Sequence, residues 1–326
     1  MRDNLLAEVE TVGTGVAAAR AETGRIVIGQ EAVVEQVLVS LLSGGHALLV
    51  GVPGLGKTLL VETLGTVLGL DARRVQFTPD LMPADITGSE VLDEDGSGRR
   101  SFRFVRGPVF CQLLMADEIN RASPRTQSAL LQAMQERKVA VAGIDQQLPR
   151  PFHVLATQNP LEQEGTYPLP EAQLDRFLMQ VDIAYPDEAA ERAMLLATTG
   201  SDVATPRPVL NAEALLAAQA LVRRLPVAER VVDAILALVR GARPESATEE
   251  AVRRHVAWGP GPRAAQALML ASRARALLDG RLSPSLEDIA ALARPVLRHR
   301  MALTFSARAD GVTLDGIIAG LVDRLG

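Results

Sequence analysis

The chain has 326 residues, enough for two domains, because a single hydrophobic core rarely grows beyond roughly 250 to 300 residues. A formal net charge of −5 argues against broad electrostatic binding to nucleic acid or to an anionic membrane. The single cysteine, Cys111, excludes an intramolecular disulfide and lies in an apolar run, so we predict that it is buried. The N-terminus lacks the apolar core of a signal peptide, and no apolar stretch approaches the roughly 18 residues of a membrane span. We therefore expect a cytoplasmic protein without membrane insertion.

The most informative motif is GVPGLGKT at residues 51–58, a complete phosphate loop of the form GxxxxGK[ST]. It lies between an apolar run, Ala47–Val50, and an amphipathic run, Leu59–Leu68, as the strand-loop-helix context requires. Its glycines let backbone N–H groups turn toward phosphates, Lys57 can reach the β and γ oxygens, and the Thr58 hydroxyl can hold Mg²⁺. The motif predicts ATP/ADP binding, with contacts from Gly51, Pro53, Gly54, Leu55, Gly56, Lys57, Thr58 and Leu59.

Short β-rich apolar runs alternate with helical patterns up to about Tyr185. This alternation predicts a parallel sheet covered by helices. The expected strands are Ala47–Val50, Arg74–Phe77, Gln112–Ala116, Val154–Thr157 and Met179–Ile183.

Two segments within this part predict β-hairpins. In the first, an apolar pair at residues 91–92 and an apolar-charged alternation at residues 102–104 flank a polar turn at residues 93–98. In the second, residues 138–143 are followed by residues 147–149. The pattern by itself is compatible with a solvated surface loop at each of the two positions.

A second nucleotide motif follows at residues 113–118, where an apolar strand ends in Asp117 and Glu118. The carboxyl ends of parallel strands face the ligand in P-loop enzymes. Asp117 would then contribute to the Mg²⁺ shell through water, and Glu118 would orient and deprotonate the attacking water. Alone, the pattern also fits a strand that ends at solvent, but its position after an intact phosphate loop favours the catalytic interpretation.

Three more polar residues lie where a ring-forming ATPase needs them. Asn159 follows another strand and can hold the lytic water, although an Asn before proline is also typical of a turn. Arg176 precedes the fifth strand and can act as an arginine finger on a neighbouring subunit, or lie at the surface beside an acid. Arg263 begins a predicted helix after Gly259-Pro260-Gly261-Pro262, so its guanidinium and the positive helix end can face one anion.

After Pro186 the composition changes to Ala, Leu and Arg at helical spacing. We predict an α/β nucleotide-binding domain over residues 1–186, with two hairpin inserts, and a smaller all-α lid domain over residues 187–326. The expected lid helices are Glu188–Ala197, Ala212–Leu225, Ala228–Arg240, Arg263–Leu278, Ser285–Arg298 and Leu314–Leu325.

The motifs GVPGLGKT, LLMADEINRA, TQNP, LPEAQLDRF and GPGPRA, taken in this order, resemble those of the AAA+ ATPases and specifically of the MoxR group. The resemblance extends over nearly the whole chain, from residues 26–30 to the lid. It implies a P-loop AAA+ core with a five-stranded parallel sheet flanked by helices, followed by the lid. In similar AAA+ proteins such hairpins project from the ring and contact the client, which is the alternative to a solvated loop for both hairpins.

The resemblance also implies roles for individual residues. Lys57 and Thr58 would bind phosphate and Mg²⁺, Asp117 and Glu118 would form the second motif, and Asn159 would be the first sensor. Arg176 would be the finger and Arg263 the second sensor, acting on the nucleotide of its own subunit or of a neighbour. Ile28 and Gly29 would lie beside the adenine.

At the level of the molecule, the resemblance implies a hexameric ring that hydrolyses ATP and, like a chaperone, remodels or activates a protein partner. In this group the partner often carries a metal-binding von Willebrand factor A domain. Alternatives are the motor subunit of a metal chelatase and a nucleotide-gated binding scaffold with little hydrolysis. A DNA-remodelling AAA+ protein is disfavoured by the acidic charge balance.

The remaining titratable residues support less. His46, His153, His255 and His299 are scattered without metal-ligand spacing, so we predict positions at strand ends and helix surfaces. The basic run 298–300 is interpreted as a solvated helix face or as part of a subunit interface.

Overall fold

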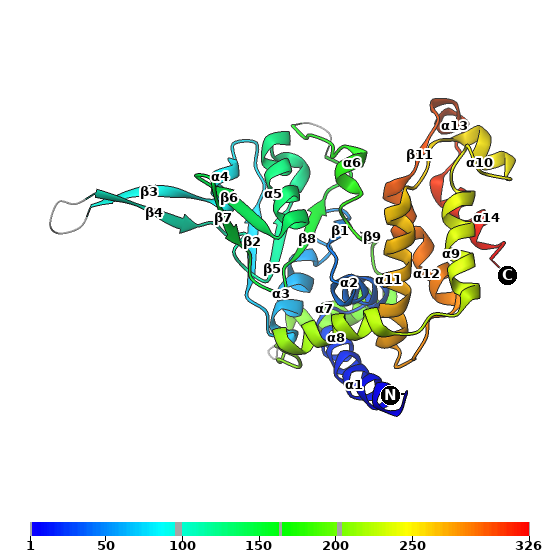
Figure 1. The fold of residues 1–326 in the computed structure, drawn as a ribbon, viewed down its shortest axis with the longest axis horizontal. Helices are drawn as coiled ribbons and strands as arrows, with labels where there is room; N and C mark the ends of the chain where they lie inside the picture. The colour runs from blue at the N-terminus through cyan, green and yellow to red at the C-terminus, as the bar shows by residue number, and fades with distance from the viewer. Residues whose placement is uncertain (1, 95–99, 163–164, 201–203, 326) are drawn as a thin grey trace.

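A five-stranded parallel sheet forms the centre of the nucleotide-binding part (Figure 1). The structure is a computed structural model that describes residues 2–94, 100–162, 165–200 and 204–325. The strand order across the sheet is β2-β5-β8-β1-β9. The strands are β1 (Ala47–Val50), β2 (Ala72–Gln76), β5 (Leu113–Asp117), β8 (His153–Gln158) and β9 (Met179–Asp182). The predicted fold class and the five predicted strands are confirmed, with ends that shift by one or two residues.

The strands run parallel, so their carboxyl ends meet along one edge of the sheet. The helices of this part surround the sheet, and the predicted helix after the phosphate loop is α3. The long N-terminal helix α1 was not predicted. The elements are α1 (Arg2–Ile26), α2 (Glu31–Leu42), α3 (Lys57–Val67), α4 (Pro83–Thr87), η1 (Ile119–Arg121), α5 (Pro124–Glu136) and α6 (Glu171–Leu174).

Both predicted hairpins are present. The first pairs β3 (Gly88–Glu94) with β4 (Arg100–Arg106) and projects far from the body of the molecule (Figure 1). Of its predicted turn, residues 95–98 lie outside the described residues. The second pairs β6 (Lys138–Val141) with β7 (Ile144–Gln147).

The C-terminal part is helical, as predicted. The Asn211 and Ser285 side chains accept hydrogen bonds from backbone N–H groups at the starts of α8 and α12, which fixes where these helices begin. A short antiparallel strand pair, β10 with β11, was not predicted. The elements are α7 (Glu188–Thr199), α8 (Ala212–Arg224), α9 (Glu229–Gly241), α10 (Glu250–His255), β10 (Val256–Trp258), α11 (Pro262–Leu278), α12 (Leu286–Leu297), η2 (Arg298–Arg300), β11 (Ala302–Leu303), α13 (Phe305–Ala309) and α14 (Leu314–Val322).

Alternate residues of the central strands pack into two separate cores. Leu49 and Leu155 point into a core that also contains α1, α2, α3 and the lid helices α8, α9, α11 and α12. Leu48 and Val154 point to the opposite face, into a core with α5 and the second hairpin. Because the first core continues from the sheet into the lid helices, the domain boundary near residue 186 stays a prediction.

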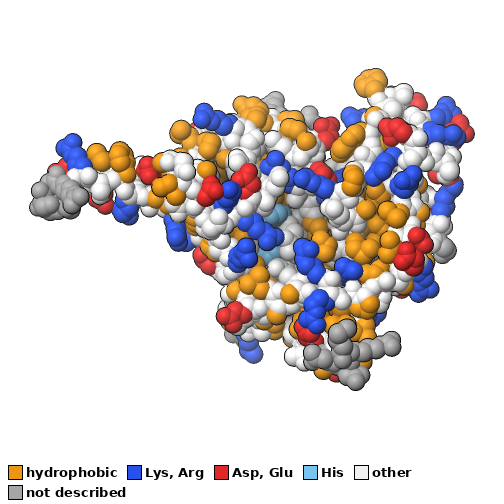
Figure 2. Space-filling view, in the orientation of Figure 1, with side chains coloured by type: hydrophobic (Ala, Val, Ile, Leu, Met, Phe, Trp, Pro, Cys, Tyr) orange, Lys and Arg blue, Asp and Glu red, His pale blue; other side chains and the backbone are white. Residues whose placement is uncertain are grey.

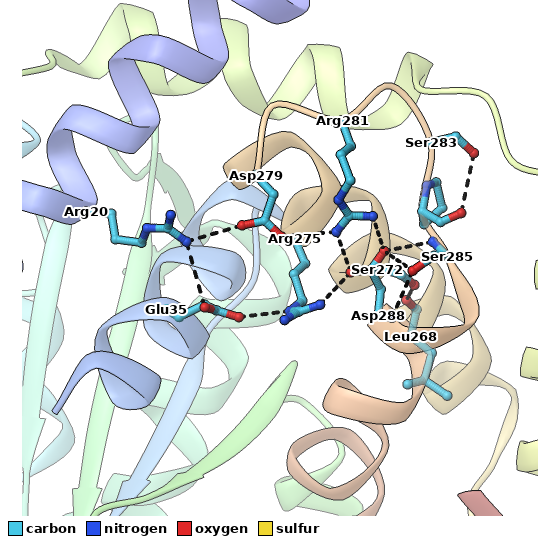
Figure 3. A network of polar contacts seen from close by, with 11 residues as sticks. Arg20, Glu35, Leu268, Ser272, Arg275, Asp279, Arg281, Ser283, Ser285 and Asp288 are labelled. Atoms are coloured by element: carbon cyan, nitrogen blue, oxygen red, sulfur yellow. Dashed lines mark hydrogen bonds and ion pairs between the residues drawn. The ribbon is translucent and has the colours of Figure 1, made fainter.

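A polar network fastens the lid to the N-terminal helices (Figure 3). Arg275 on α11 donates to Glu35 on α2 at 2.8 Å and to Asp288 on α12 at 2.6 Å. Arg281 also donates to Asp288, and Arg20 on α1 reaches Asp279. Burial opposes ionisation of Asp288, but the hydrogen bonds from Arg281, the Ser285 N–H and Arg275 outweigh it and lower its pKa. The network therefore ties helices from both ends of the chain into one unit.

Candidate nucleotide site

The phosphate loop connects β1 to α3 with the backbone that phosphate binding requires. Gly54 and Gly56 have φ of +86° and +72°, values that favour glycine. No side chain caps the start of α3, so its first N–H groups remain available to an anion. The Lys57 ammonium donates to the loop carbonyls of Gly51 and Val52, and the Gln30 amide donates to Leu55 O at 2.8 Å. The carbonyl groups of the loop thus hold the Lys57 ammonium in place.

An apolar pocket of about 210 Å³ adjoins the loop. Ile28 and Leu59 line it together with Gly54, Leu55 and Gly56, which are predicted nucleotide contacts. Gly29 lies next to it with φ +73°, and an added Cβ there would meet the Ala190 side chain at 2.4 Å. Met194, Ala197 and Thr198 of α7 complete the wall. The pocket has the apolar lining that suits an adenine ring.

The acidic motif ends β5, beside the phosphate loop at the carboxyl edge of the sheet. Asp117 is 8% exposed, and its carboxylate accepts hydrogen bonds from Thr157 Oγ1 at 2.5 Å and from Arg74 Nη2 at 2.5 Å. The same Thr157 hydroxyl accepts a hydrogen bond from the Glu118 N–H at 2.8 Å. Thr157 on β8 therefore couples the two acidic residues.

Glu118 has a left-handed backbone with φ +55°, which is uncommon for a residue with a side chain and typical of functional turns. Its carboxylate accepts from Gln76 Nε2 at 2.6 Å and from Arg121 Nη1 at 2.9 Å. These two hydrogen bonds hold the carboxylate in one orientation just beyond the end of β5.

Asn159 lies one residue beyond β8 and is buried, 5% exposed. Its Oδ1 accepts a hydrogen bond from the Leu161 N–H at 3.1 Å, which holds the side chain in place. Because β8 pairs with β5, Asn159 and the acidic motif end neighbouring strands.

The oxygen donors near the loop fit a hard divalent cation. Thr58 is in the first turn of α3, directly after Lys57, so its hydroxyl lies at the phosphate loop. The Asp117 carboxylate adds negative charge at the same edge. Hydroxyl and carboxylate oxygens are the donors that Mg²⁺ prefers, and Mg²⁺ retains several waters of its own. Burial lowers the pKa of Lys57, while the Asp117 and Glu118 carboxylates oppose that shift.

Arg176 and Arg263 lie in a different cavity from the phosphate loop. This arginine cavity is lined by Arg176, Arg263, Arg300 and Asp175, with His46 and Gln266 among its other residues. Figure 2 shows a hollow in the middle of the molecule, with histidine at its floor and Lys or Arg side chains beside it. Asp175 accepts from Arg300 Nε at 2.7 Å, and Arg263 lies 3.5 Å from its other oxygen. The Asp175 carboxylate thus lies between the guanidinium groups of Arg300 and Arg263, and Arg176 lines the same cavity.

The interpretation of Arg300 as part of a solvated helix face is wrong. Arg300 is 2% exposed and donates to the carbonyls of Phe177 and Leu178 as well as to Asp175. His299 is buried beside it, not at a helix surface. Arg300 therefore fixes the segment that carries Arg176.

Sequence reasoning did not single out Thr157, Arg74 or Gln30. Thr157 precedes Asn159 by two residues, so the alternation of β8 could have indicated it. The contacts of Arg74 and Gln76 with the acidic motif depend on the register of β2 against β5, which cannot be read from the sequence.

The fold and this site define a P-loop protein of the AAA+ class. Residues 46–179 match the family model described as "ATPase family associated with various cellular activities (AAA)", and residues 248–320 match the AAA lid domain. The chain is 42% identical to Chaperone MoxR1 of Mycobacterium tuberculosis, over 97% of this chain and 82% of that protein. It is 33% identical to Protein MoxR of Paracoccus denitrificans, over 88% of each.

A solved structure from Cytophaga hutchinsonii, of a protein assigned as an ATPase, superimposes with a TM-score of 0.90 at 35% identity. The match covers 98% of this chain and 97% of that one. The chain belongs to the MoxR family of AAA+ ATPases. Among the described helices, none has the length and apolar character needed to cross a membrane.

Proposed function

We propose that the protein hydrolyses ATP at the phosphate loop and uses the cycle to remodel a protein partner. The observation that carries the proposal is the hydrogen-bonded group of Asp117, Thr157 and Glu118 beside the loop. Lys57 would bind the β and γ phosphates, and Thr58, with Asp117 through water, would hold Mg²⁺. The bound Mg²⁺ would supply neutralisation of phosphate charge.

In this proposal Glu118 accepts a proton from the attacking water and Asn159 orients that water from the neighbouring strand. The hydrogen bonds that Glu118 accepts from Gln76 and Arg121 support its role, because they hold the carboxylate in one position. The buried Asn159, fixed by the Leu161 N–H, supports the second role. Attack by water on the γ-phosphate would then release ADP and phosphate.

We further propose that Arg176 and Arg263 act on the nucleotide of a neighbouring subunit. They share the arginine cavity, and neither lines the pocket beside their own phosphate loop. With three arginines and one aspartate among its lining residues, the cavity carries excess positive charge that suits a γ-phosphate. A site completed in this way closes into a ring, for which the family resemblance implies six subunits.

The name of the mycobacterial relative, a chaperone, supports a chaperone-like role for this chain. A client with a von Willebrand factor A domain, or another metal-handling protein, is the partner that the family resemblance implies.

The test is ATP turnover per subunit against protein concentration, repeated with Arg176→Ala protein mixed into the wild type. We expect specific activity to rise with concentration and the variant to reduce it by more than simple dilution. Flat turnover per subunit, with only dilution by the variant, would instead mean that each subunit's site is self-contained.

A further inference from the structure

An apolar groove on the lid continues from the arginine cavity. This lid groove lies between α9 and α11 and includes Gln266 and Leu270, which also line the arginine cavity. Its apolar lining consists of Val232, Ile235, Leu236, Ala265, Met269 and Leu270. Leu236 is 47% exposed, and Val232, Ala265, Met269 and Leu270 are partly exposed, whereas Ile235 is buried, so part of this apolar surface faces solvent.

Two unpaired arginines lie at the lid groove. Arg223, at the end of α8, lines it, and Arg273 follows Met269 by one turn of α11. Neither forms an ion pair with a described residue, and Arg273 Nε is buried without a hydrogen-bond partner there. Burial, with the charge of Arg223, lowers the pKa of Arg273. The groove thus offers apolar contact next to positive charge that lacks an acidic partner.

Helix α7 has the complementary character. One face lines the nucleotide pocket through Met194 and Ala197. The other carries Glu188, Glu191 and Leu195, which helical spacing places on one stripe. Leu195 and its neighbour Leu196 are 60% and 67% exposed, and neither glutamate forms an ion pair with a described residue.

We propose that the lid groove receives α7 of the next copy of this chain. The inference rests on the proposed function, in which the nucleotide of a neighbouring subunit reaches Arg176 and Arg263 in the arginine cavity. Helix α7 of that neighbour forms a wall of the pocket beside its phosphate loop, so it is brought close to the lid groove, which adjoins the arginine cavity. Leu195 and Leu196 then pack on the apolar side chains of α9 and α11, and Glu188 and Glu191 approach Arg223 and Arg273. The groove and α7 are different surfaces, so the contact is head-to-tail and can repeat around a ring.

The first experiment uses cysteine cross-linking at the two exposed leucines. The native Cys111 is buried, so it contributes little background. A chain carrying both Leu195→Cys and Leu236→Cys, treated with a short bifunctional thiol reagent, should form covalent multimers larger than dimers. A mixture of the two single variants should stop at dimers, and neither single variant should cross-link with itself. A matched control combines Leu195→Cys with Phe305→Cys, an 89% exposed residue on α13 that does not line the groove.

The outcomes separate this inference from the proposed function. Cross-links specific to the Leu195 and Leu236 pair support it. Suppose that cross-links are absent, or form with the same yield as in the Phe305 control, while Arg176→Ala protein still reduces the turnover of the mixture by more than dilution. This result overturns the α7 contact but leaves the proposed shared site intact. Self-linking of Leu195→Cys alone also overturns it, since that requires a symmetric contact. If the protein stays monomeric and its ATP turnover per subunit does not change with protein concentration, both proposals are contradicted.

Charge reversal gives an independent readout. Arg223→Glu should raise the protein concentration at half-maximal specific activity by about tenfold, as expected for loss of one charge pair at an interface. Adding Glu191→Arg to the same chain should restore much of the loss, because the reversed charges meet again between subunits. Unchanged assembly in Arg223→Glu, or no recovery in the double variant, would contradict the predicted charge pairing.

Discussion

Thr157 holds the two carboxylates of the acidic motif in one arrangement. Its buried hydroxyl donates to Asp117 and accepts from the Glu118 N–H, so a single oxygen fixes both residues. Asp117, Glu118 and Asn159 were proposed as site residues from local motifs, since each follows an apolar strand in the sequence. Thr157 and Arg74 act through hydrogen bonds between neighbouring strands, and those contacts exist only once the sheet has formed.

At the residue scale, we expect Thr157→Val to reduce ATP turnover by at least about tenfold with little change in ATP affinity. Loss of the hydroxyl leaves the Glu118 N–H and an Asp117 oxygen without a partner, which misplaces both carboxylates. Steady-state phosphate release and nucleotide titration measure the two quantities. Thr157→Ser keeps the hydroxyl and should recover most activity; equal losses in both variants would point to packing instead.

Glu118→Gln should bind ATP normally and lower turnover by about a hundredfold or more, because the amide cannot accept a proton from water. A single-turnover assay measures the chemical step directly. Glu136→Gln, a change at the last residue of α5, is the matched control. Near-normal turnover of Glu118→Gln would remove this carboxylate from the catalytic role.

At the element scale, helix α11 links the arginine cavity to the N-terminal helices. It begins beside Arg263 and ends near Arg275, which bridges α2 and α12 (Figure 3). The helices themselves followed from periodicity and from caps such as Asn211 and Ser285. The sequence did not indicate which helices would pack against one another, because contacting residues such as Glu35 and Arg275 are 240 residues apart in the chain.

We predict that Asp288→Ala lowers the free energy of unfolding by about 3 to 5 kcal/mol, because it leaves Arg275 and Arg281 without their shared buried partner. Asp279→Ala removes a carboxylate that is 30% exposed, and should cost only about 0 to 1 kcal/mol. Urea unfolding curves measure both changes. A similar small loss in the two variants would show that the network contributes little to stability.

At the scale of the whole molecule, three buried histidines make stability depend on pH. Burial lowers the pKa of His46 to about 3 and of His153 to about 4, and that of His299 well below its ordinary 6.5. In each case the unfolded chain binds a proton that the folded protein excludes. Their stabilising contribution is therefore complete above pH 6.5 and falls as the pH drops toward the folded pKa values.

Below pH 6.5 we expect the free energy of unfolding to fall by up to about 4 kcal/mol per pH unit, or about 1.4 for each histidine. Urea unfolding between pH 7.5 and 5 measures the slope, since this window lies above the ordinary carboxylate pKa range. His153→Gln should reduce the slope by about a third even if it also lowers stability overall. A slope that His153→Gln leaves unchanged would contradict the assignment.

The sequence by itself determined the fold class, the phosphate loop and the acidic motif, because each depends on residues that are neighbours in the chain or repeat at a fixed period. It also indicated Arg176 and Arg263 as residues of interest. Only the tertiary structure decided that these two arginines share a cavity with Asp175 and Arg300, apart from the phosphate loop. That placement depends on how the lid packs on the sheet, through contacts between residues more than a hundred positions apart, such as Arg300 with Asp175.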